Sequence, residues 1–306
     1  MRRQSEPKNN IDNDDMSIKY RTLAASPHTI LKCRDRELPL HERTHIMGVL
    51  NLTPDSFYDG GRYFEVDLAL KRAEKMIEEG ADIVDIGGES TRPGSEGISE
   101  EEEITRVIPV IREIYKRFDI VMSVDTTKPR VAREALDEGV SVINDISGLK
   151  FDDEIAELAS RYGAALVLMH TTSRPRDMQK KTQYASLIDD VMESLQISVN
   201  KAIEKGVGED SILVDPGIGF GKTAEQNLIL LKHLNRLGEL GKPVLIGTSN
   251  KSFIGHTLGT PVNDRTEGTA ATVAIAILNG ASVIRVHDVA YMKRVSRMAD
   301  AVSKAN

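Results

Sequence analysis

Residues 45 to 61 read HIMGVLNLTPDSFYDGG, an apolar run that changes abruptly into a polar loop. The apolar side chains from Ile46 to Leu50 predict a short strand covered on both faces, as strands of parallel sheets are. Pro54 and the pair Gly60-Gly61 predict a loop after this strand rather than a helix. Polar residues therefore gather just beyond the carboxyl end of the strand: Asn51, Thr53, Asp55, Ser56 and Asp59.

The rest of the chain repeats this arrangement of a short apolar run followed by a helical stretch. Strands are predicted at about 46–50, 83–86, 120–124, 141–143, 164–168, 212–214, 244–246 and 283–286. Helices are predicted at about 66–77, 99–117, 129–137, 153–162, 184–205, 224–237, 251–258, 266–278 and from the last strand to about 302. Eight strand-then-helix units predict an α/β fold with a parallel sheet, closed most economically as a (β/α)8 TIM barrel. A doubly wound open sheet is the alternative, but residues 51–61 lack the G-x-G-x-x-G that normally follows its first strand.

The sequence before the barrel predicts two smaller parts. Residues 1–17 hold almost no side chain that could pack, so we expect a disordered tail, and its acidic residues argue against a targeting segment. The segments TILKC and ELPL flank the polar turn 34–36, which predicts a small hairpin at about residues 28–41. Residues 18–306 are expected to form one domain. Cys33, with no His or Cys at ligand spacing, is interpreted as a structural residue.

Composition limits the classes of partner. The chain of 306 residues is 40% hydrophobic and 28% charged, as ordinary globular proteins are. Its formal net charge of -7 argues against a nucleic-acid partner. One cysteine allows no intrachain disulfide and favours the cytoplasm. No apolar run approaches the roughly 20 residues needed to cross a bilayer, so no membrane partner is expected.

Every predicted strand ends in polar residues. In chain order these ends carry Asn51; Glu89, Thr91, Arg92 and Pro93; Asp125 with Lys128; Asn144 and Asp145; His170; Asp215, Phe220 and Lys222; Lys251 and Ser252; Arg285 and His287. Each alone could be a helix cap, a turn former or a surface residue. Because the chemistry of TIM barrels lies at the carboxyl ends of the strands, we expect them to meet at one rim.

The rim residues differ in chemistry. Donors and cations, next to Asp55 and Asp59, suit a polyanion held with a hard divalent cation such as Mg2+: Asn51, Arg92, Arg285 and His287. Acceptors suited to the paired N–H donors of a flat heterocycle are Asp125, Asn144 and Asp215, and Lys251 can approach such a ring's carbonyl. The helix that begins near Ser252 suits a carboxylate. Zinc is not expected, because no His/Cys cage is visible.

Two glycine-rich runs are not phosphate or nucleophile motifs. Residues 217–223 lack the glycine spacing of Walker A and of G-x-G-x-x-G, and the run from Gly247 has Lys251 where a nucleophile elbow needs glycine.

Seven segments resemble the signature segments of the dihydropteroate synthase family: MGVLNLTPDSFYDGG, DIGGESTRPGS, SVDTTKP, INDISG, DPGIGFGK, NKSFIG and IRVHDV. The resemblance covers about residues 45–300. It implies a transferase of folate biosynthesis, the target of sulfonamides, that joins 6-hydroxymethyl-7,8-dihydropterin pyrophosphate to para-aminobenzoate and releases pyrophosphate. It also implies Mg2+ as the cofactor and a homodimer.

The resemblance implies a role for each matching residue. The pterin would be held by Asp125, Asn144, Asp215 and Lys251. The pyrophosphate would be bound by Asn51, Arg285 and His287, with Mg2+ on Asn51. The para-aminobenzoate pocket would be formed or bordered by Thr91, Arg92, Pro93, Phe57, Phe220 and Ser252. The residues expected to act in catalysis are Asp125, Asp215, Lys251, Arg285 and His287.

Two segments depart from the family pattern, and two alternative functions follow. Asn250 stands where the family usually has arginine, and residues 169–173 read MHTTS instead of M-H-M-Q-G. Altered affinity for aminobenzoate or sulfonamides is a hypothesis based on Asn250. The alternatives are a pterin-binding methyltransferase-type barrel using methyl-tetrahydrofolate and a corrinoid partner, and a non-catalytic homologue. The phosphate-binding end at Arg285 and His287 disfavours the first.

Overall fold

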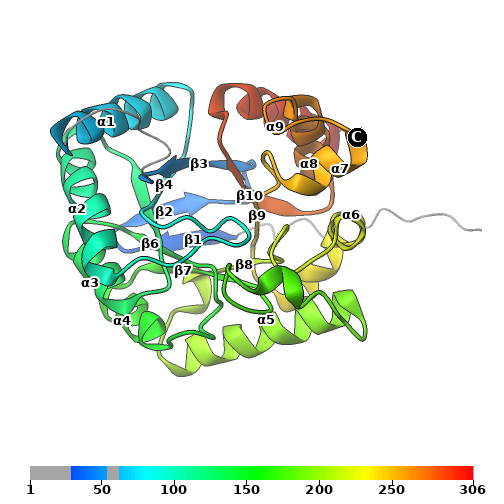
Figure 1. The fold of residues 1–306 in the computed structure, drawn as a ribbon, viewed down its shortest axis with the longest axis horizontal. Coiled ribbons are helices and arrows are strands. Elements are labelled where there is room, and N and C mark those ends of the chain that lie inside the picture. The colour runs from blue at the N-terminus through cyan, green and yellow to red at the C-terminus, as the bar shows by residue number, and fades with distance from the viewer. Residues whose placement is uncertain (1–28, 54–61, 306) are drawn as a thin grey trace, which may run out of the picture.

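The structure, a computed structural model, describes residues 29–53 and 62–305, and within these ranges eight parallel strands close into a barrel (Figure 1). In chain order the strands are β3 (His45–Asn51), β4 (Ile83–Gly87), β5 (Val121–Asp125), β6 (Val142–Asp145), β7 (Ala165–Met169), β8 (Ile212–Asp215), β9 (Val244–Ile246) and β10 (Ala281–Val286). Each strand pairs with the next, and β10 closes the ring by pairing with β3. The predicted TIM barrel is confirmed, and the open sheet is not formed.

Helices surround the ring of strands (Figure 1). They are α1 (Arg62–Glu78), α2 (Glu100–Arg117), α3 (Pro129–Asp137), α4 (Glu154–Tyr162), α5 (Leu187–Glu204), α6 (Ala224–Lys232), α7 (Ser252–Leu258), α8 (Thr266–Leu278) and α9 (Val289–Ser303). Short 3-10 segments lie at Met178–Lys180, Glu209–Ser211 and Leu234–Leu240. Among the residues described, no helix combines the length and the apolar character that crossing a membrane requires.

Strand alternation separates the barrel interior from the helix layer. On β4, Val84 and Ile86 pack in the large core between strands and helices, whereas Ile83 belongs to a second core inside the barrel. Asp85 follows Ile83 on the inward face, because successive strand residues point to opposite sides. The same two-residue step leads from Val283 to Arg285 on β10. The interior is therefore apolar at the amino ends of the strands and polar at their carboxyl ends.

An antiparallel hairpin closes the apolar end of the barrel. It consists of β1 (Ile30–Cys33) and β2 (Arg36–Pro39), which lie across the middle of the ring in Figure 1. Leu31 and Cys33 are fully buried and pack in the same inner core as Met47. Burial raises the pKa of the Cys33 thiol to about 12. The predicted hairpin is confirmed, and Cys33 occupies a packing position rather than a ligand position.

Some predicted boundaries are wrong for local reasons. The helix predicted at 224–237 ends at Lys232, and the chain continues as the 3-10 segment Leu234–Leu240. Ser99 and Glu102 have the spacing of a capping box before α2, but only half of it forms: Ser99 accepts the Glu102 N–H, and the Glu102 carboxylate pairs with Arg106 instead of returning to the cap. The predicted tail and the first-loop residues Asp55, Phe57 and Asp59 lie outside the described residues.

Candidate functional site

A cavity opens at the carboxyl ends of the strands, on the barrel axis. It is lined by Thr91, Asp125, Asn144, Ile146, Met169, Asp215, Ile218, Phe220, Gly247, Lys251 and Arg285. Seven of these are residues that the sequence predicts for the site, and they come from six different strand ends. The structure therefore brings together the acceptors expected for a heterocycle, the lysine, and the arginine expected for phosphate.

Arg285 joins the two sides of this cavity. Its Nε donates to Asp85 Oδ2 at 2.6 Å and its Nη2 donates to Asp125 Oδ2 at 2.7 Å. Asp85 Oδ2 also accepts a hydrogen bond from Asn144 Nδ2 at 3.1 Å. Asp85 is 0% exposed, so it fixes the guanidinium and the amide from beneath the cavity floor. An arginine held at two points in this way is pre-positioned for an anion.

Asp85 is a site residue that the sequence analysis missed. The available signal was an acidic residue inside the apolar strand run IVDIG, at an inward position two residues before the strand end. A buried carboxylate needs a partner, so its presence indicates a basic residue or hydrogen-bond donors inside the barrel.

Burial makes the ionisable groups of the cavity unusual. It raises the pKa of Asp215 to about 6, and it raises the pKa of Asp125 although the Arg285 guanidinium opposes that rise. Burial and the nearby Arg285 charge lower the pKa of Lys251 to about 8. Asp125 Oδ1 is buried without a hydrogen-bond partner in the described part of the chain. These groups can thus gain hydrogen bonds from a bound ligand at little further desolvation cost.

The turn after β8 shapes one wall of the cavity. Asp215 Oδ1 accepts the Gly217 N–H at 2.7 Å, and Gly217 has a φ of +70°. A Cβ at Gly217 would lie 2.0 Å from the His170 carbonyl oxygen, so only glycine fits. Phe220 projects into the cavity, and Lys251 Nζ lies 4.3 Å above its ring centroid.

Lys222 supports this turn from below. Its ammonium donates to the carbonyls of Gly217 and Phe220, each at 3.0 Å, and lies 2.9 Å from His170 Nδ1. Lys222 is 3% exposed, and burial lowers its pKa to about 7. The side chain is therefore turned into the protein, so this glycine-rich run does not present a phosphate-binding lysine.

Asp145 ends β6 but does not join the cavity. Its two carboxylate oxygens accept the backbone N–H groups of Ser147 and Leu149, at 2.8 and 2.7 Å. Asp145 therefore shapes its own loop, which is the turn-forming role that each strand-end residue could have by itself.

His287 and Asn51 lie beside the cavity, near its cationic end. His287 Nδ1 is 3.0 Å from Ser249 Oγ, and its carbonyl accepts from Arg72 Nη2 at 2.5 Å. Burial and the charges of Arg285 and Lys251 lower the pKa of His287 to about 4. Asn51 ends β3 in register with Gly87, which is in turn in register with Asp125.

The loop after β4 is held at both of its ends by one lysine. Lys128 Nζ pairs with Glu89 at the start of the loop and donates to the Ile98 carbonyl at its end, at 2.9 Å. The same ammonium donates to Glu103 Oε2 of α2 at 2.5 Å, and Glu103 is 1% exposed. At the tip, Gly94 N–H donates to the Pro175 carbonyl at 3.0 Å. This loop carries Thr91, Arg92 and Pro93, so Lys128 sets where they lie.

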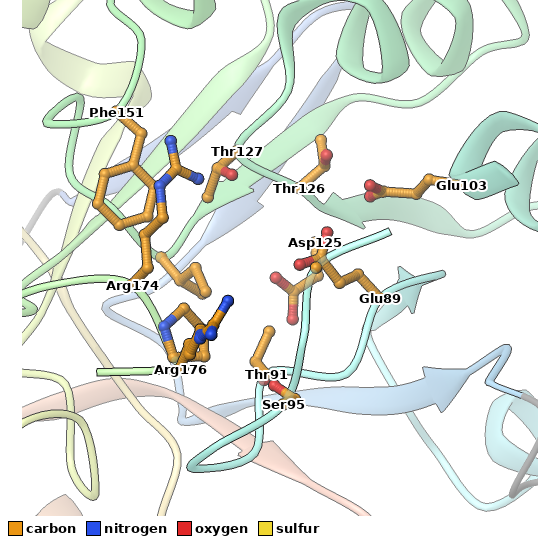
Figure 2. A pocket seen from close by; sticks show the side chains of 13 residues that line it. Glu89, Thr91, Ser95, Glu103, Asp125, Thr126, Thr127, Phe151, Arg174 and Arg176 are labelled. Carbon is orange, nitrogen blue, oxygen red and sulfur yellow. The ribbon is translucent and has the colours of Figure 1, made fainter. Parts of the chain in front are cut away.

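A side cavity of about 230 Å³ lies next to the first, and Thr91, Asp125 and Ile146 line both. Figure 2 shows Glu89, Thr91 and Asp125 on one side of it and Arg174 against the Phe151 ring on the other. The predicted residues Pro93 and Ser252 are exposed and line neither cavity, and Arg92 is also exposed. Ser252 is the first residue of α7.

Asn250 has a left-handed backbone, with a φ of 58°. Its N–H donates to Thr269 Oγ1 at 3.2 Å and its carbonyl accepts from Arg265 at 2.9 Å, while the residue itself is exposed. Asparagine adopts this conformation more readily than most residues do. Asparagine is therefore well suited to the backbone conformation at position 250.

The described residues hold no group of three His, Cys, Asp or Glu side chains arranged for a metal ion. The site instead combines carboxylate and amide acceptors, a lysine over an aromatic ring, and a paired arginine next to a neutral histidine. A TIM-barrel enzyme with this site is suited to bind a flat, amide-like ring beside an anionic group.

Comparisons with known proteins agree with this class. The model of the family described as "Pterin binding enzyme" matches residues 47–287. A dihydropteroate synthase of Clostridium beijerinckii is 48% identical over 89% of this chain and 99% of its own length. Two solved dihydropteroate synthases are similar in fold. That of Clostridium difficile, in the presence of pteroic acid, has a TM-score of 0.82, 43% identity and coverage of 86% and 98% of the two chains. That of Xanthomonas albilineans, with 4-aminobenzoic acid, has a TM-score of 0.85, 38% identity and coverage of 91% and 100%.

The chain belongs to the pterin-binding enzymes and, within them, to the dihydropteroate synthases, which are transferases. The resemblance in the sequence motifs is confirmed. These relatives give no support to the methyltransferase or the non-catalytic alternative.

Proposed function

We propose that this protein acts in folate biosynthesis as a dihydropteroate synthase, joining 6-hydroxymethyl-7,8-dihydropterin pyrophosphate to para-aminobenzoate and releasing pyrophosphate. The observation that carries the proposal is the single cavity in which Asp125, Asn144 and Asp215 converge with Lys251 and Arg285. Pteroic acid and 4-aminobenzoic acid, found with two of its structural relatives, are a product-like and a substrate compound of this reaction.

We assign the pterin to the acceptor side of the cavity. Asp215 and Asn144 suit the N–H and amino groups of the ring, because both line the cavity and both carry a side-chain oxygen that can accept a hydrogen bond. Lys251, protonated near neutral pH, suits the ring carbonyl. Loss of pyrophosphate leaves positive charge on the pterin methylene and ring, which the carboxylates of Asp125 and Asp215 stabilise in the transition state.

We assign the pyrophosphate to Arg285, His287 and Asn51. Arg285 and His287 donate to the phosphate oxygens, where negative charge grows as the bond to the methylene carbon breaks. When bound, Mg2+ supplies a counter-charge to the pyrophosphate. Asn51 would hold it with one amide oxygen, which fits an ion that takes most of its ligands from phosphates and water. The described side chains offer no fuller metal cage.

We assign the aminobenzoate to the rim formed by the Thr91–Pro93 loop, Phe220 and Ser252. The nitrogen of a neutral arylamine attacks the methylene carbon and then loses a proton. No covalent enzyme intermediate is needed, because the amine itself is the nucleophile. The first loop, which carries Phe57, lies outside the described residues.

The decisive assay measures pyrophosphate release. We expect release only when the pterin pyrophosphate, para-aminobenzoate and Mg2+ are all present, and its loss on adding EDTA. Omitting para-aminobenzoate is the internal control. Methyl transfer from methyl-tetrahydrofolate without pyrophosphate release, or pterin binding without turnover, would overturn the proposal.

Pterin affinity should be greatest between about pH 6 and pH 8. Below this range Asp215, whose pKa is about 6, becomes protonated and loses an acceptor, and above it Lys251, whose pKa is about 8, loses its charge. Calorimetric titration with a pterin across pH 5 to 10 measures both limbs. In a Lys251→Arg variant the alkaline limb should disappear, because arginine stays charged to about pH 12. If the alkaline limb is unchanged in that variant, the loss of affinity at high pH is caused by a group other than Lys251.

Lys128→Met should raise the KM for para-aminobenzoate by about tenfold and change pterin affinity by less than about twofold. The substitution removes the cation that joins Glu89, Ile98 and Glu103, so the loop carrying Thr91 loses the anchors at its two ends and keeps the one at its tip. Steady-state kinetics with each substrate varied gives the two values. Lys116→Met is the matched control, since Lys116 on the exposed face of α2 pairs only with Glu113 among the residues that the structure describes. An equal rise in both substrate constants would contradict a role confined to the loop.

We further propose a homodimer formed through α8 and α9, and a cytoplasmic location. Ile275 and Leu278 of α8 are 45% and 44% exposed, and Met298 and Val302 of α9 are 65% and 52% exposed. The two helices are neighbours in Figure 1, and we propose that these exposed apolar side chains contribute to one dimer interface. Sedimentation should give twice the chain mass, and Ile275→Glu with Met298→Glu should give the monomer.

The proposed cytoplasmic location rests on the cysteine content, because a single buried thiol at Cys33 suits a reducing compartment.

A further inference from the structure

Ser249 contacts His287 at two points, from the loop directly after β9. Its Oγ accepts the backbone N–H of His287 at 3.3 Å and lies 3.0 Å from the ring Nδ1. Ser249 is 7% exposed, and His287 is partly buried. The two contacts together leave the hydroxyl little freedom to turn.

The hydroxyl hydrogen of Ser249 has one acceptor within reach among the residues that the structure describes, and this is His287 Nδ1. A serine hydroxyl carries a single hydrogen and two lone pairs, one of which already receives the backbone N–H. The opposite arrangement, with Nδ1–H donating to Oγ, would leave the serine hydrogen without a partner in a nearly buried place, which costs free energy.

We propose that Ser249 is a positioning residue that holds His287 in the tautomer with its hydrogen on Nε2. In a neutral imidazole one nitrogen donates and the other accepts, so the partner of Nδ1 decides what Nε2 can do. With Nδ1 accepting from Ser249, Nε2 becomes a hydrogen-bond donor. The inference rests on the proposed function in one respect: the acceptor for Nε2–H is a phosphate oxygen of the pyrophosphate group.

The charges around His287 agree with this assignment. Arg285, Lys251, Arg92 and Arg72 all lie close enough to disfavour a protonated ring, and burial acts in the same direction. The ring is therefore neutral at pH 7 in the free protein, and a neutral ring has a tautomer to be fixed. Among cations that attract an anion, a neutral donor adds a hydrogen bond and no further repulsion.

The backbone of His287 is held at its N–H by Ser249 and at its carbonyl by Arg72. Arg72 Nη2, from α1, donates to the His287 carbonyl at 2.5 Å, while the N–H of His287 is bonded to Ser249. Two elements on opposite sides of the β10 end thus hold the residue. Removing the Ser249 hydroxyl should free the ring tautomer, while Arg72 still holds the His287 carbonyl.

The direct test is nitrogen-15 NMR of the full-length protein labelled in its histidines. His287 is assigned by comparison with a His287→Gln variant, since the chain has 7 histidines. We expect the wild-type spectrum to show protonated Nε2 and unprotonated Nδ1. Ser249→Ala should give a mixture of tautomers and weaken the binding of inorganic pyrophosphate with Mg2+ by about tenfold. Ser249→Thr, which keeps a hydroxyl, should restore both.

Thr248→Val is the matched control. Thr248 is fully buried one residue earlier in the chain, and its hydroxyl is bonded to Thr272 rather than to His287. It should leave the His287 tautomer unchanged, and circular dichroism checks that each variant is folded.

The outcomes separate the inference from the proposed function. Protonated Nδ1 in the wild-type protein would overturn the inference even in an active enzyme. Wild-type pyrophosphate affinity in folded Ser249→Ala would also overturn it. The expected tautomer in a protein that neither binds nor releases pyrophosphate would confirm the hydrogen bond and overturn the function assigned to it.

Discussion

Arg285→Met should lower kcat/KM by at least about a thousandfold and destabilise the protein by about 3–5 kcal/mol. Two losses combine. The guanidinium that we assign to the leaving pyrophosphate disappears, and the carboxylates of Asp85 and Asp125 lose the cation that bonds to both of them. Asp85 has no exposed surface on which to be solvated, so its charge stays uncompensated in the barrel. Urea unfolding followed by circular dichroism and the pyrophosphate assay measure the two effects.

A surface arginine provides the control for this substitution. Arg112 on α2 makes a two-pronged contact with Glu138, but both side chains are partly exposed. Arg112→Met should therefore cost less than about 1 kcal/mol and leave activity intact. An Arg285→Met protein within about 1 kcal/mol of wild type would mean that Asp85 and Asp125 are neutralised by other means.

Asp215→Asn should weaken pterin binding by about a hundredfold or more and change the free energy of unfolding by about 1 kcal/mol or less. The asparagine oxygen can still accept the Gly217 N–H that Asp215 accepts at 2.7 Å, so the turn is kept. The other oxygen becomes an NH2 group that faces the donors of the ring instead of accepting from them. Calorimetry with a pterin and urea unfolding give the two values.

The stability part of this prediction follows from the sign of the pKa shift. Burial raises the pKa of Asp215 from 3.8 to about 6, so the folded state favours the protonated form. The stabilising contribution of that proton is complete below about pH 4 and is lost as the pH rises through about 6. At pH 7 the ionised carboxylate destabilises the folded state. Replacing it with a neutral amide removes that destabilisation.

Asp145→Asn is the matched comparison, and the opposite pattern is expected. Both oxygens of Asp145 accept backbone N–H groups, so an amide leaves one of them unpaired, at a cost of about 1–3 kcal/mol. Pterin binding should not change, because Asp145 does not line the cavity. Equal losses of binding in the two variants would indicate that Asp215 acts through the loop structure and not through direct contact.

The architecture and most of the cavity lining could be predicted because their signals are local. Each strand is a short apolar run, and each polar end lies next to its own run in the sequence. Helix ends were less predictable: the residues after Lys232 continue an apolar pattern, yet the chain tightens into a 3-10 segment there. Packing against neighbours decides such boundaries more than propensity does.

The roles of Asp85, Lys128 and Ser249 could not be predicted in the same way. Each acts on a residue far away in the chain, and the sequence contains no measure of that pairing. Asp85 and Arg285 are separated by 200 positions, and Lys128 and Glu89 by 39. Ser249 is 38 positions from His287.

The sequence by itself determined the order of strands and helices, the family, and which polar residues stand at strand ends, because alternation and motif spacing operate within a few residues. Only the tertiary structure decided which of these side chains are partners. Closing the ring places β10 against β3, the last strand against the first. Arginine, aspartate and asparagine from distant segments then share one buried space, where a charge must find its partner or stay unpaired.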